Sequence, residues 1–216
     1  PLVDCKECKS RFREDKIDVK APCEKCGAKD SFTEPRDFNL MFETTMGPVK
    51  DSGAKVYLRP ETAQGIFVNY LNVQSTMRKK LPFGVAQIGK AFRNEITPGN
   101  FIFRTREFEQ MEVEYFVHPD TWKEHFTHWQ EEIQTFTKII GLPEEMVHEL
   151  EVEGEDRAHY SERTIDFEFE YPFGKKELYG LAYRTDYDLK KHMEHSKTKL
   201  QFRDDTTNEV FIPHVI

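Results

Sequence analysis

Residues 84–115 restrict the fold of this chain most strongly, because they read as two strands joined by one tight loop. In the loop Thr97-Pro98-Gly99-Asn100, Pro and Gly occupy the positions that a type II turn requires. Proline fixes φ near its turn value, and glycine accepts a positive φ. The pattern therefore predicts an antiparallel hairpin in which the second strand returns beside the first.

Charged side chains gather on one face of this hairpin, because side chains alternate across a strand. The members of this polar face are Gln87, Arg93, Glu95, Arg104, Arg106, Phe108, Gln110 and Glu112. The residues expected on the opposite, apolar face are Ile88, Phe92, Met111, Val113, Tyr115 and Val117, with the last four in the core. The polar face suits an anionic ligand with an aromatic base. An ordinary amphipathic hairpin with a solvated, salt-bridged face explains the composition equally well.

Helical spacing marks two further segments. Pro60 is expected to open a helix, because proline suits a first helical turn. The apolar residues of this helix are Ala63, Ile66, Phe67, Tyr70, Leu71 and Val73. Residues 121–140 predict a second helix, with Thr121 and Glu124 at capping-box spacing and Gly141 as its stop. The apolar stripe of the second helix is Trp122, Phe126, Trp129, Ile133, Phe136 and Ile140, and its two tryptophans are expected in the core.

Strands dominate the rest of the chain. Residues 164–171 alternate with Ile165, Phe167, Phe169 and Tyr171 facing inward, and residues 177–183 follow after a turn. A short helix with His192 and His195 comes next, and both histidines are interpreted as surface residues. Hairpin-connected strands with flanking helices predict an α+β fold with an antiparallel sheet. No GxGxxG or P-loop sequence is present, which excludes those two kinds of nucleotide site.

Three motifs together resemble a known family. Phe92-Arg93-Asn94-Glu95, a loop, and then residues 104–108 (RTREF) resemble motif 2 of the class II aminoacyl-tRNA synthetases. With residues 59–67 (RPETAQGIF) and 184–189 (RTDYDL), the chain is similar to the dimeric type of glycyl-tRNA synthetase over nearly its whole length. The resemblance implies the class II catalytic fold.

The resemblance also implies an ATP site. Arg93 is its catalytic residue, which meets the charge that develops at the α-phosphate. Phe108 would stack on adenine, and Glu177 is a candidate Mg²⁺ ligand. The full ATP set is Arg93, Asn94, Glu95, Phe103, Arg104, Thr105, Arg106, Glu107, Phe108, Glu177 and Leu178.

A glycine pocket follows from the same resemblance, with Glu61 and Glu112 holding the ammonium group. The implied set is Glu61, Phe108, Glu109, Gln110, Met111 and Glu112. Other interpretations exist for both acids. Glu61 is also favourable as an acid in the first turn of a helix, and Glu112 can pair with a site arginine and merely order the hairpin.

The four cysteines lie in a small module, residues 1–34. Cys5-x2-Cys8 and Cys23-x2-Cys26 have the two-knuckle spacing of a structural zinc ribbon. The alternative is four reduced, buried cysteines. The basic residues between the knuckles can contact tRNA or simply form a solvated surface. Residues 35–216 would then be the synthetase core.

Composition and the chain ends add expectations about the setting. The formal net charge of −8 argues against a bulk polyanion-binding surface, and no apolar run reaches the length of a membrane span. Paired CxxC motifs fit a reducing cytoplasm.

The resemblance implies glycine, ATP and tRNA(Gly) as partners, and a homodimer. The chain is expected to be the central piece of a larger enzyme, without motifs 1 and 3. A non-catalytic, synthetase-like nucleic-acid-binding or accessory protein is the alternative.

Overall fold

The computed structural model describes residues 1–14, 17–49 and 53–216. The chain divides into two compact units. Unit 1 comprises residues 1–60, 92–99 and 104–106, and unit 2 comprises residues 61–91, 100–103 and 107–216. No helix in the described part of the chain is both long and apolar enough to cross a membrane.

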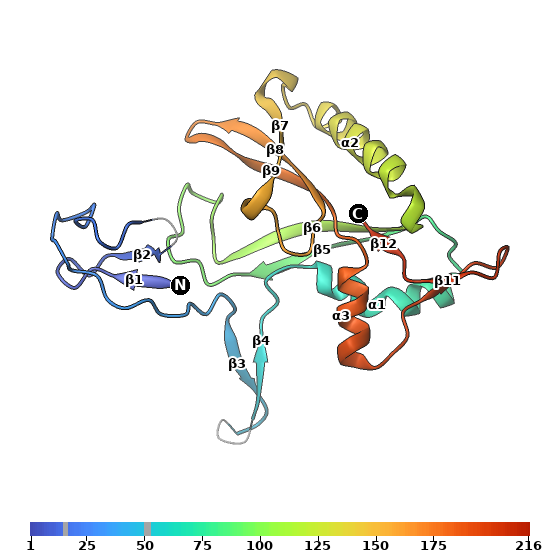
Figure 1. Ribbon diagram of the computed structural model, residues 1–216, viewed down its shortest axis with the longest axis horizontal. Coiled ribbons are helices and arrows are strands. Elements are labelled where there is room, and N and C mark those ends of the chain that lie inside the picture. The colour runs from blue at the N-terminus through green and yellow to red at the C-terminus, as the bar shows by residue number, and fades with distance from the viewer. Residues whose placement is uncertain (15–16, 50–52) are drawn as a thin grey trace. The chain divides into compact units, whose positions relative to one another are not determined.

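Unit 1 contains two small antiparallel strand pairs (Figure 1). Strand β1 (Leu2–Asp4) pairs with β2 (Arg11–Arg13), and β3 (Glu43–Met46) pairs with β4 (Ala54–Tyr57). Val3 and Cys5 are fully buried beside the first pair, where Cys5 also forms a bridge to Phe32. Such small strand pairs bury little apolar surface, so the first of them needs further support from its cysteines.

The central sheet of unit 2 has the strand order β12-β6-β5, with β5 (Phe83–Phe92), β6 (Glu107–Val117) and β12 (His214–Val215). Helices α1 (Ala63–Thr76) and α3 (Tyr187–Ser196) lie on one side of these strands (Figure 1). They share one buried apolar cluster with the sheet, made of Ala63, Ile66, Phe67, Tyr70, Phe83, Phe116, Leu189, Leu200 and Val215.

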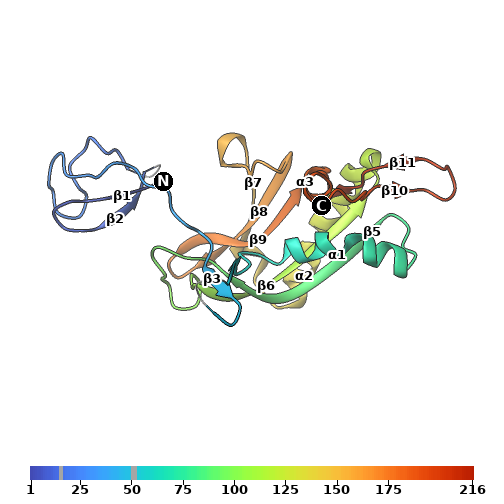
Figure 2. The same cartoon turned by 90° about the horizontal axis from the view of Figure 1, so that it is seen from below.

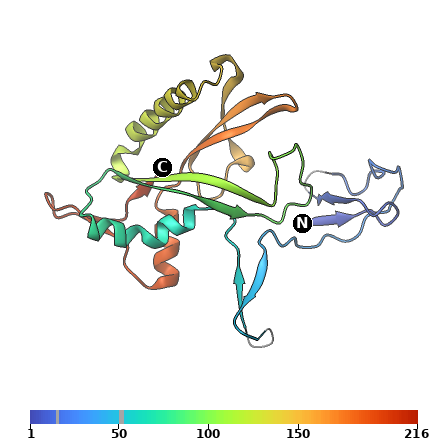
Figure 3. The same cartoon turned by 180° about the vertical axis from the view of Figure 1, so that it is seen from behind.

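A second layer covers the other side of β6 (Figure 3). It consists of α2 (Trp122–Ile139) and the antiparallel sheet β7 (Val147–Glu151), β8 (Arg163–Tyr171) and β9 (Gly174–Tyr183). Its buried cluster is Val117, Phe126, Ile165, Phe167, Leu181, Tyr183 and Ile216. Adjacent residues of β6 therefore enter different cores, Phe116 the first and Val117 the second.

The remaining elements of unit 2 are short. A hairpin of β10 (Phe202–Arg203) and β11 (Val210–Phe211) precedes β12 (Figure 2). Three 3-10 turns cover Pro119–Thr121, Glu144–Met146 and Gly154–Asp156. With antiparallel sheets and three α-helices in its described part, the chain has the predicted α+β class.

Several predicted elements are confirmed. The helix at 121–140 is α2, which ends before Gly141 at a φ of +79°. Its two tryptophans pack into the second core, and Trp122 stacks on Tyr183 with ring centroids 3.8 Å apart. The strands at 164–171 and 177–183 pair as β8 and β9, with Ile165 and Phe167 buried.

The predicted core face of β6 is partly wrong. Val117 is buried, but Met111 is 57% exposed and Val113 is 38% exposed. The second layer covers only the end of β6, where Tyr115 packs against Trp129, and it does not reach the residues before that. The face predicted to be polar instead runs into the first core, because Phe116 follows the polar residues on that face.

Three local predictions are also wrong. The hairpin loop does not turn at Gly99 with a positive φ, because Asn100 and Phe101 take the left-handed conformation at φ values of 53° and 58°. Helix α1 begins at Ala63 rather than at Pro60. The Thr121 side chain makes no capping bond, since its hydroxyl donates to the carbonyl of His118 instead.

Candidate functional site

The predicted phosphate-binding arginines belong to unit 1, in the segments that follow β5 and precede β6 along the chain. The backbone N–H of Arg93 donates to the carbonyl of Arg106 over 3.0 Å. Arg104 Nη1 lies 3.4 Å from Glu95 Oε2, and Arg106 Nε donates to the Glu95 carbonyl over 3.2 Å. The structure thus brings Arg93, Glu95, Arg104 and Arg106 together around one short ladder.

Backbone contacts fix the orientation of Arg93 and Asn94. Arg93 Nε donates to the carbonyl of Pro60 over 2.9 Å, and the Asn94 amide donates to the carbonyl of Asn39 over 2.9 Å. Three guanidinium groups with one carboxylate leave a positive site, and guanidinium groups match phosphate oxygens in charge and geometry. Thr105, between Arg104 and Arg106, is half-buried.

The other members of the predicted ATP set lie in unit 2. Phe108 is half-buried on β6, and Glu107 is exposed and pairs with Lys90. Phe103 packs edge-on against Tyr171 and Phe173, with ring centroids 5.1 and 5.0 Å apart, which is a structural contact. On β9, Glu177 is exposed and Leu178 is half-buried.

The predicted glycine pocket has its firmest contact between Glu112 and the start of α1. Glu112 Oε2 accepts a hydrogen bond from the backbone N–H of Thr62 over 2.7 Å and another from the Thr62 hydroxyl. Thr62 is fully buried and precedes the first residue of the helix. Its hydroxyl therefore holds the strand carboxylate and makes no capping bond to the helix.

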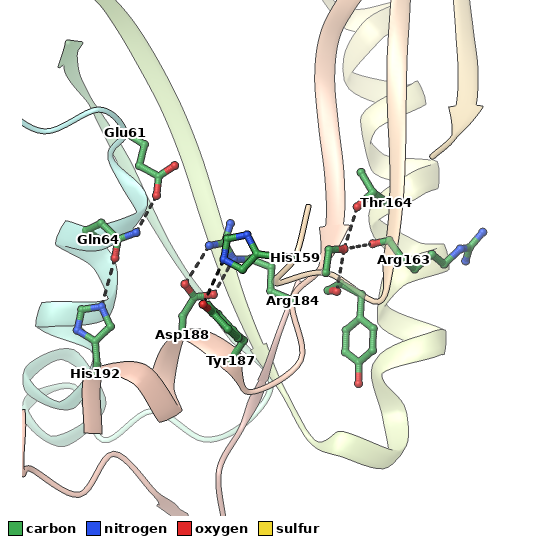
Figure 4. A network of polar contacts seen from close by, with 11 residues as sticks. Glu61, Gln64, His159, Arg163, Thr164, Arg184, Tyr187, Asp188 and His192 are labelled. Atoms are coloured by element: carbon green, nitrogen blue, oxygen red, sulfur yellow. Dashed lines mark hydrogen bonds and ion pairs between the residues drawn. The ribbon is translucent and has the colours of Figure 1, made fainter. Parts of the chain in front are cut away.

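Glu61 belongs to a chain of polar contacts on the same side of the sheet (Figure 4). Gln64 Nε2 donates to Glu61 Oε1 over 2.7 Å, and Gln64 Oε1 lies 3.2 Å from His192 Nε2 on α3. His192 is half-buried, so the interpretation of it as a surface residue holds only in part. His195, one turn later on the same helix, is exposed as predicted.

An ion pair that the sequence prediction missed joins Arg184 to Asp188, the second residue of α3 (Figure 4). Arg184 donates to both oxygens of Asp188, from Nε over 2.7 Å and from Nη2 over 2.9 Å, and both residues are buried. The guanidinium carbon lies 3.9 Å from the ring centroid of Tyr160. Burial alone would lower the pKa of Arg184, but the hydrogen bond to Asp188 and the charge of Glu114 raise it overall. Arg184 therefore stays charged.

The sequence prediction also missed Glu114. It lies two positions after Glu112 on the same face of β6 and is 4% exposed. Burial raises the pKa of Glu114 to about 8, against the lowering effect of Arg184, with smaller raising effects from Asp188, Glu112 and Glu61. Near neutral pH Glu114 therefore holds its proton and Asp188 is neutralised by Arg184, which leaves Glu61 and Glu112 as the carboxylates that can attract a small cation.

Stability should depend on pH through Glu114. Its folded pKa of about 8 exceeds the ordinary value of 4.5. Between these two pH values only the folded state holds the proton. The free energy of unfolding is therefore highest below pH 4.5 and decreases as the pH rises to 8. Glu114→Gln should be equal to wild type at pH 5 and more stable by about 3 kcal/mol at pH 8, measured by urea unfolding. An equal difference at both pH values, or none beyond that of the exposed control Glu132→Gln, would contradict this assignment.

The remaining residues of the predicted glycine set divide between the two faces of β6. Gln110 lies half-buried on the same face as Glu112, and its Oε1 is buried without a hydrogen-bond partner in the described structure. Glu109 and Met111 lie on the opposite face and are exposed.

The four cysteines of unit 1 converge as the spacing predicts. Their sulfur atoms all lie within 4.8 Å of one another, with Cys5 and Cys26 at 3.7 Å and Cys8 and Cys23 at 3.8 Å. A tetrahedral ion with Zn–S bonds of about 2.3 Å requires sulfurs roughly 3.8 Å apart, so the donor set fits zinc. Four buried thiols do not describe the site, because Cys26 is exposed.

Cys5 has the environment of a metal-ligating thiolate. The Ser31 hydroxyl lies 3.3 Å from its sulfur, and this hydrogen bond is the main reason that the pKa of Cys5 is lowered. The hydrogen bond at the Ala28 backbone lowers the pKa of Cys26 in the same cluster, but burial and the other cysteines outweigh this effect and raise it overall. Thiolates are the form that binds metal.

We expect one zinc per chain, bound by the four cysteines through sulfur alone. Elemental analysis of protein purified without chelators should give that ratio, and Cys8→Ser should abolish it. Because β1 and β2 have little core of their own, a chelator should also make residues 1–34 sensitive to protease. Metal-free protein with an intact, protease-resistant module would contradict the prediction.

Comparison with known proteins agrees with the sequence motifs. Residues 42–212 match the tRNA synthetase class II core domain (G, H, P, S and T). The chain is 50% identical over 244 aligned positions to a protein named glycine–tRNA ligase from Clostridium acetobutylicum, and the match covers 100% of this chain and 53% of that protein. Proteins of the same name from Caldanaerobacter subterraneus subsp. tengcongensis and Geobacillus thermodenitrificans are 50% and 49% identical, each with 52% of its length covered.

The chain spans about half the length of the curated relatives that it matches. The family match includes both strands of the hairpin, the start of α1 and the Arg184–Asp188 pair, which are the elements that build the candidate site. The resemblance predicted from the motifs is thereby confirmed, and the chain belongs to the family of class II tRNA synthetase core domains.

Proposed function

We propose that the protein containing this chain is a glycine–tRNA ligase, which activates glycine with ATP and transfers it to tRNA(Gly). The contacts that hold the Glu61 and Glu112 carboxylates in unit 2 are the observation that carries the proposal, because two positioned acids can bind one small cation. The name shared by relatives at about 50% identity supports the same substrate.

Glycine has only two charged groups that a protein can bind, its ammonium group and its carboxylate. Glu61 and Glu112 would hold the ammonium, and the Thr62 contacts keep the Glu112 carboxylate from turning away. A pocket can reject larger amino acids by size, and no standard amino acid is smaller than glycine. In this proposal the two carboxylates select the ammonium, and rejection of larger amino acids would depend on the size of the site.

The first chemical step would be attack by a glycine carboxylate oxygen on the α-phosphorus of ATP. A new P–O bond forms, the bond to the β-phosphate oxygen breaks, and pyrophosphate leaves. Two anions approach in this step, so fixed positive charge is needed where charge develops. Arg93 would supply it, with Arg104 and Arg106 on the other phosphates. In the second step a ribose hydroxyl of the tRNA attacks the glycyl carbonyl, and AMP leaves.

Other groups in the proposal have supporting roles. Phe108 would stack on adenine, and Glu95 would accept from its amino group. Mg²⁺ commonly binds through one or two carboxylates plus substrate phosphates, and the exposed Glu177 fits as one such ligand. Bound Mg²⁺ would neutralise phosphate charge. Structural zinc, a homodimer and a cytoplasmic setting complete the proposal.

The direct test is exchange of labelled pyrophosphate into ATP by the full-length protein, with glycine and with alanine as the control amino acid. Glycine-dependent exchange, followed by charging of tRNA(Gly), is the expected result. If neither glycine nor alanine supported exchange, the proposal would fail. Binding of tRNA without any exchange would favour a non-catalytic, synthetase-like accessory protein instead.

A further inference from the structure

We propose that His192 and Gln64 form a positioning relay that holds the Glu61 carboxylate in the orientation that receives the glycine ammonium. The inference rests on the proposed function and extends it to two residues outside the glycine pocket. Gln64 follows Glu61 by three residues, whereas His192 comes from α3, which lies far along the chain (Figure 4).

The direction of the relay follows from the chemistry of its two ends. An ionised carboxylate can only accept hydrogen bonds, so the atom of Gln64 that lies 2.7 Å from Glu61 Oε1 must be the amide nitrogen. The amide oxygen of Gln64 then faces His192 Nε2 at 3.2 Å and can only accept. His192 must therefore carry its proton on Nε2 and donate it to Gln64.

Packing fixes the histidine that starts this relay. The imidazole of His192 lies against the buried ring of Phe67, with centroids 5.7 Å apart. Phe67 belongs to the core that joins α1 to α3. Gln64 itself is exposed, so without a partner its amide would sample several rotamers in water. The hydrogen bond from a fixed imidazole selects the rotamer that donates to Glu61.

Glu61 needs such support more than Glu112 does. Glu112 is held by a backbone N–H and a hydroxyl of the buried Thr62. Glu61 lies before the first residue of α1, at a half-buried position, and its side-chain contact in the structure is to Gln64. One carboxylate of the pocket is thus fixed from the helix start and the other through α3.

The relay is tested by glycine-dependent pyrophosphate exchange in the full-length protein. His192→Phe keeps a ring against Phe67 but removes the donor, and Gln64→Met keeps the length but removes the amide. Each variant should raise the KM for glycine roughly 3- to 10-fold and leave the KM for ATP and kcat within about twofold. His192→Gln, whose amide can still donate, should recover most of the loss. His195→Phe, on the exposed part of the same helix, is the matched control.

Coupling separates a relay from two independent structural effects. In the Gln64→Met background, His192→Phe should have no further effect on the KM for glycine. The nitrogen NMR signals of His192 should also report a proton on Nε2. Additive effects, equal changes in the KM for glycine and ATP, or a neutral imidazole with its proton on Nδ1 would overturn the relay. Wild-type protein without glycine-dependent exchange would overturn the proposed function and the relay together, whereas loss in Glu61→Gln without loss in His192→Phe would overturn only the relay.

Discussion

Replacing Arg93 with alanine should abolish glycine-dependent pyrophosphate exchange while the protein remains folded. Arg93 would meet charge that appears mainly in the transition state, so its loss should cost on the order of 3 kcal/mol or more, at least a 100-fold decrease in kcat. The hydrogen bond from Arg93 Nε to the Pro60 carbonyl fixes the guanidinium before ATP arrives. A lysine at this position carries the charge but not the planar fork, so Arg93→Lys should recover little.

The control for Arg93 is Arg11→Ala. Arg11 is an exposed arginine of the same unit, and it pairs with Asp4 at 2.7 Å. This variant removes an equal charge from unit 1 and should leave exchange unchanged. Thermal unfolding of both variants separates a chemical loss from a folding defect. Near-normal exchange by Arg93→Ala would remove Arg93 from the mechanism.

Glu112→Gln should raise the KM for glycine by roughly 10- to 150-fold, because hydrogen bonds to charged groups contribute about 1.5–3 kcal/mol. The variant keeps the size of the side chain and one acceptor oxygen for Thr62 but removes the charge. The KM for ATP should change little. Glu61→Gln should behave in the same way, and the exposed Glu132→Gln should match wild type in steady-state kinetics.

The alternative for Glu112 is a purely structural tie between β6 and α1. In that case Thr62→Val, which removes the hydroxyl, would lower the unfolding temperature as much as Glu112→Gln does, and neither would alter glycine kinetics selectively. Unchanged KM and kcat for glycine in both Glu112→Gln and Glu61→Gln would leave the pocket without its proposed ligands.

The helices and strands were predicted well from the sequence where a single stripe of apolar residues packs into a single core. Helix α2 and the β8–β9 hairpin each have a single apolar stripe, and both form as predicted. Strand β6 was harder because its two faces enter different cores near its end, with Phe116 on one side and Val117 on the other. Alternation reveals two faces, but it does not reveal how far along the strand each covering layer extends.

Local sequence patterns predicted which acids belong to the proposed glycine site, but not the residues that hold them. Glu61 and Glu112 came from motifs, whereas their contacts depend on long-range packing. His192 was assigned to the surface because no metal-ligand partner stood at a fitting spacing, yet its partner Gln64 lies 128 positions away. The Arg184–Asp188 pair had a local signal, an arginine and an acid four residues apart at the start of a helix. Both residues lie within the RTDYDL motif, but the sequence alone assigned neither of them a role.

The division of β6 between two cores also limits how the pairing of this strand can fail. Phe116 is paired with Val215 and Val117 with His214 on β12. A slip of one position would push Phe116 out of one core and Val117 out of the other, and it would turn Glu112 and Glu114 toward the wrong side of the sheet. The apolar packing of Phe116 and Val117 therefore fixes the register that orients Glu112 and Glu114, which lie four and two residues before Phe116. The chain cannot misplace the acids without first unpacking both cores.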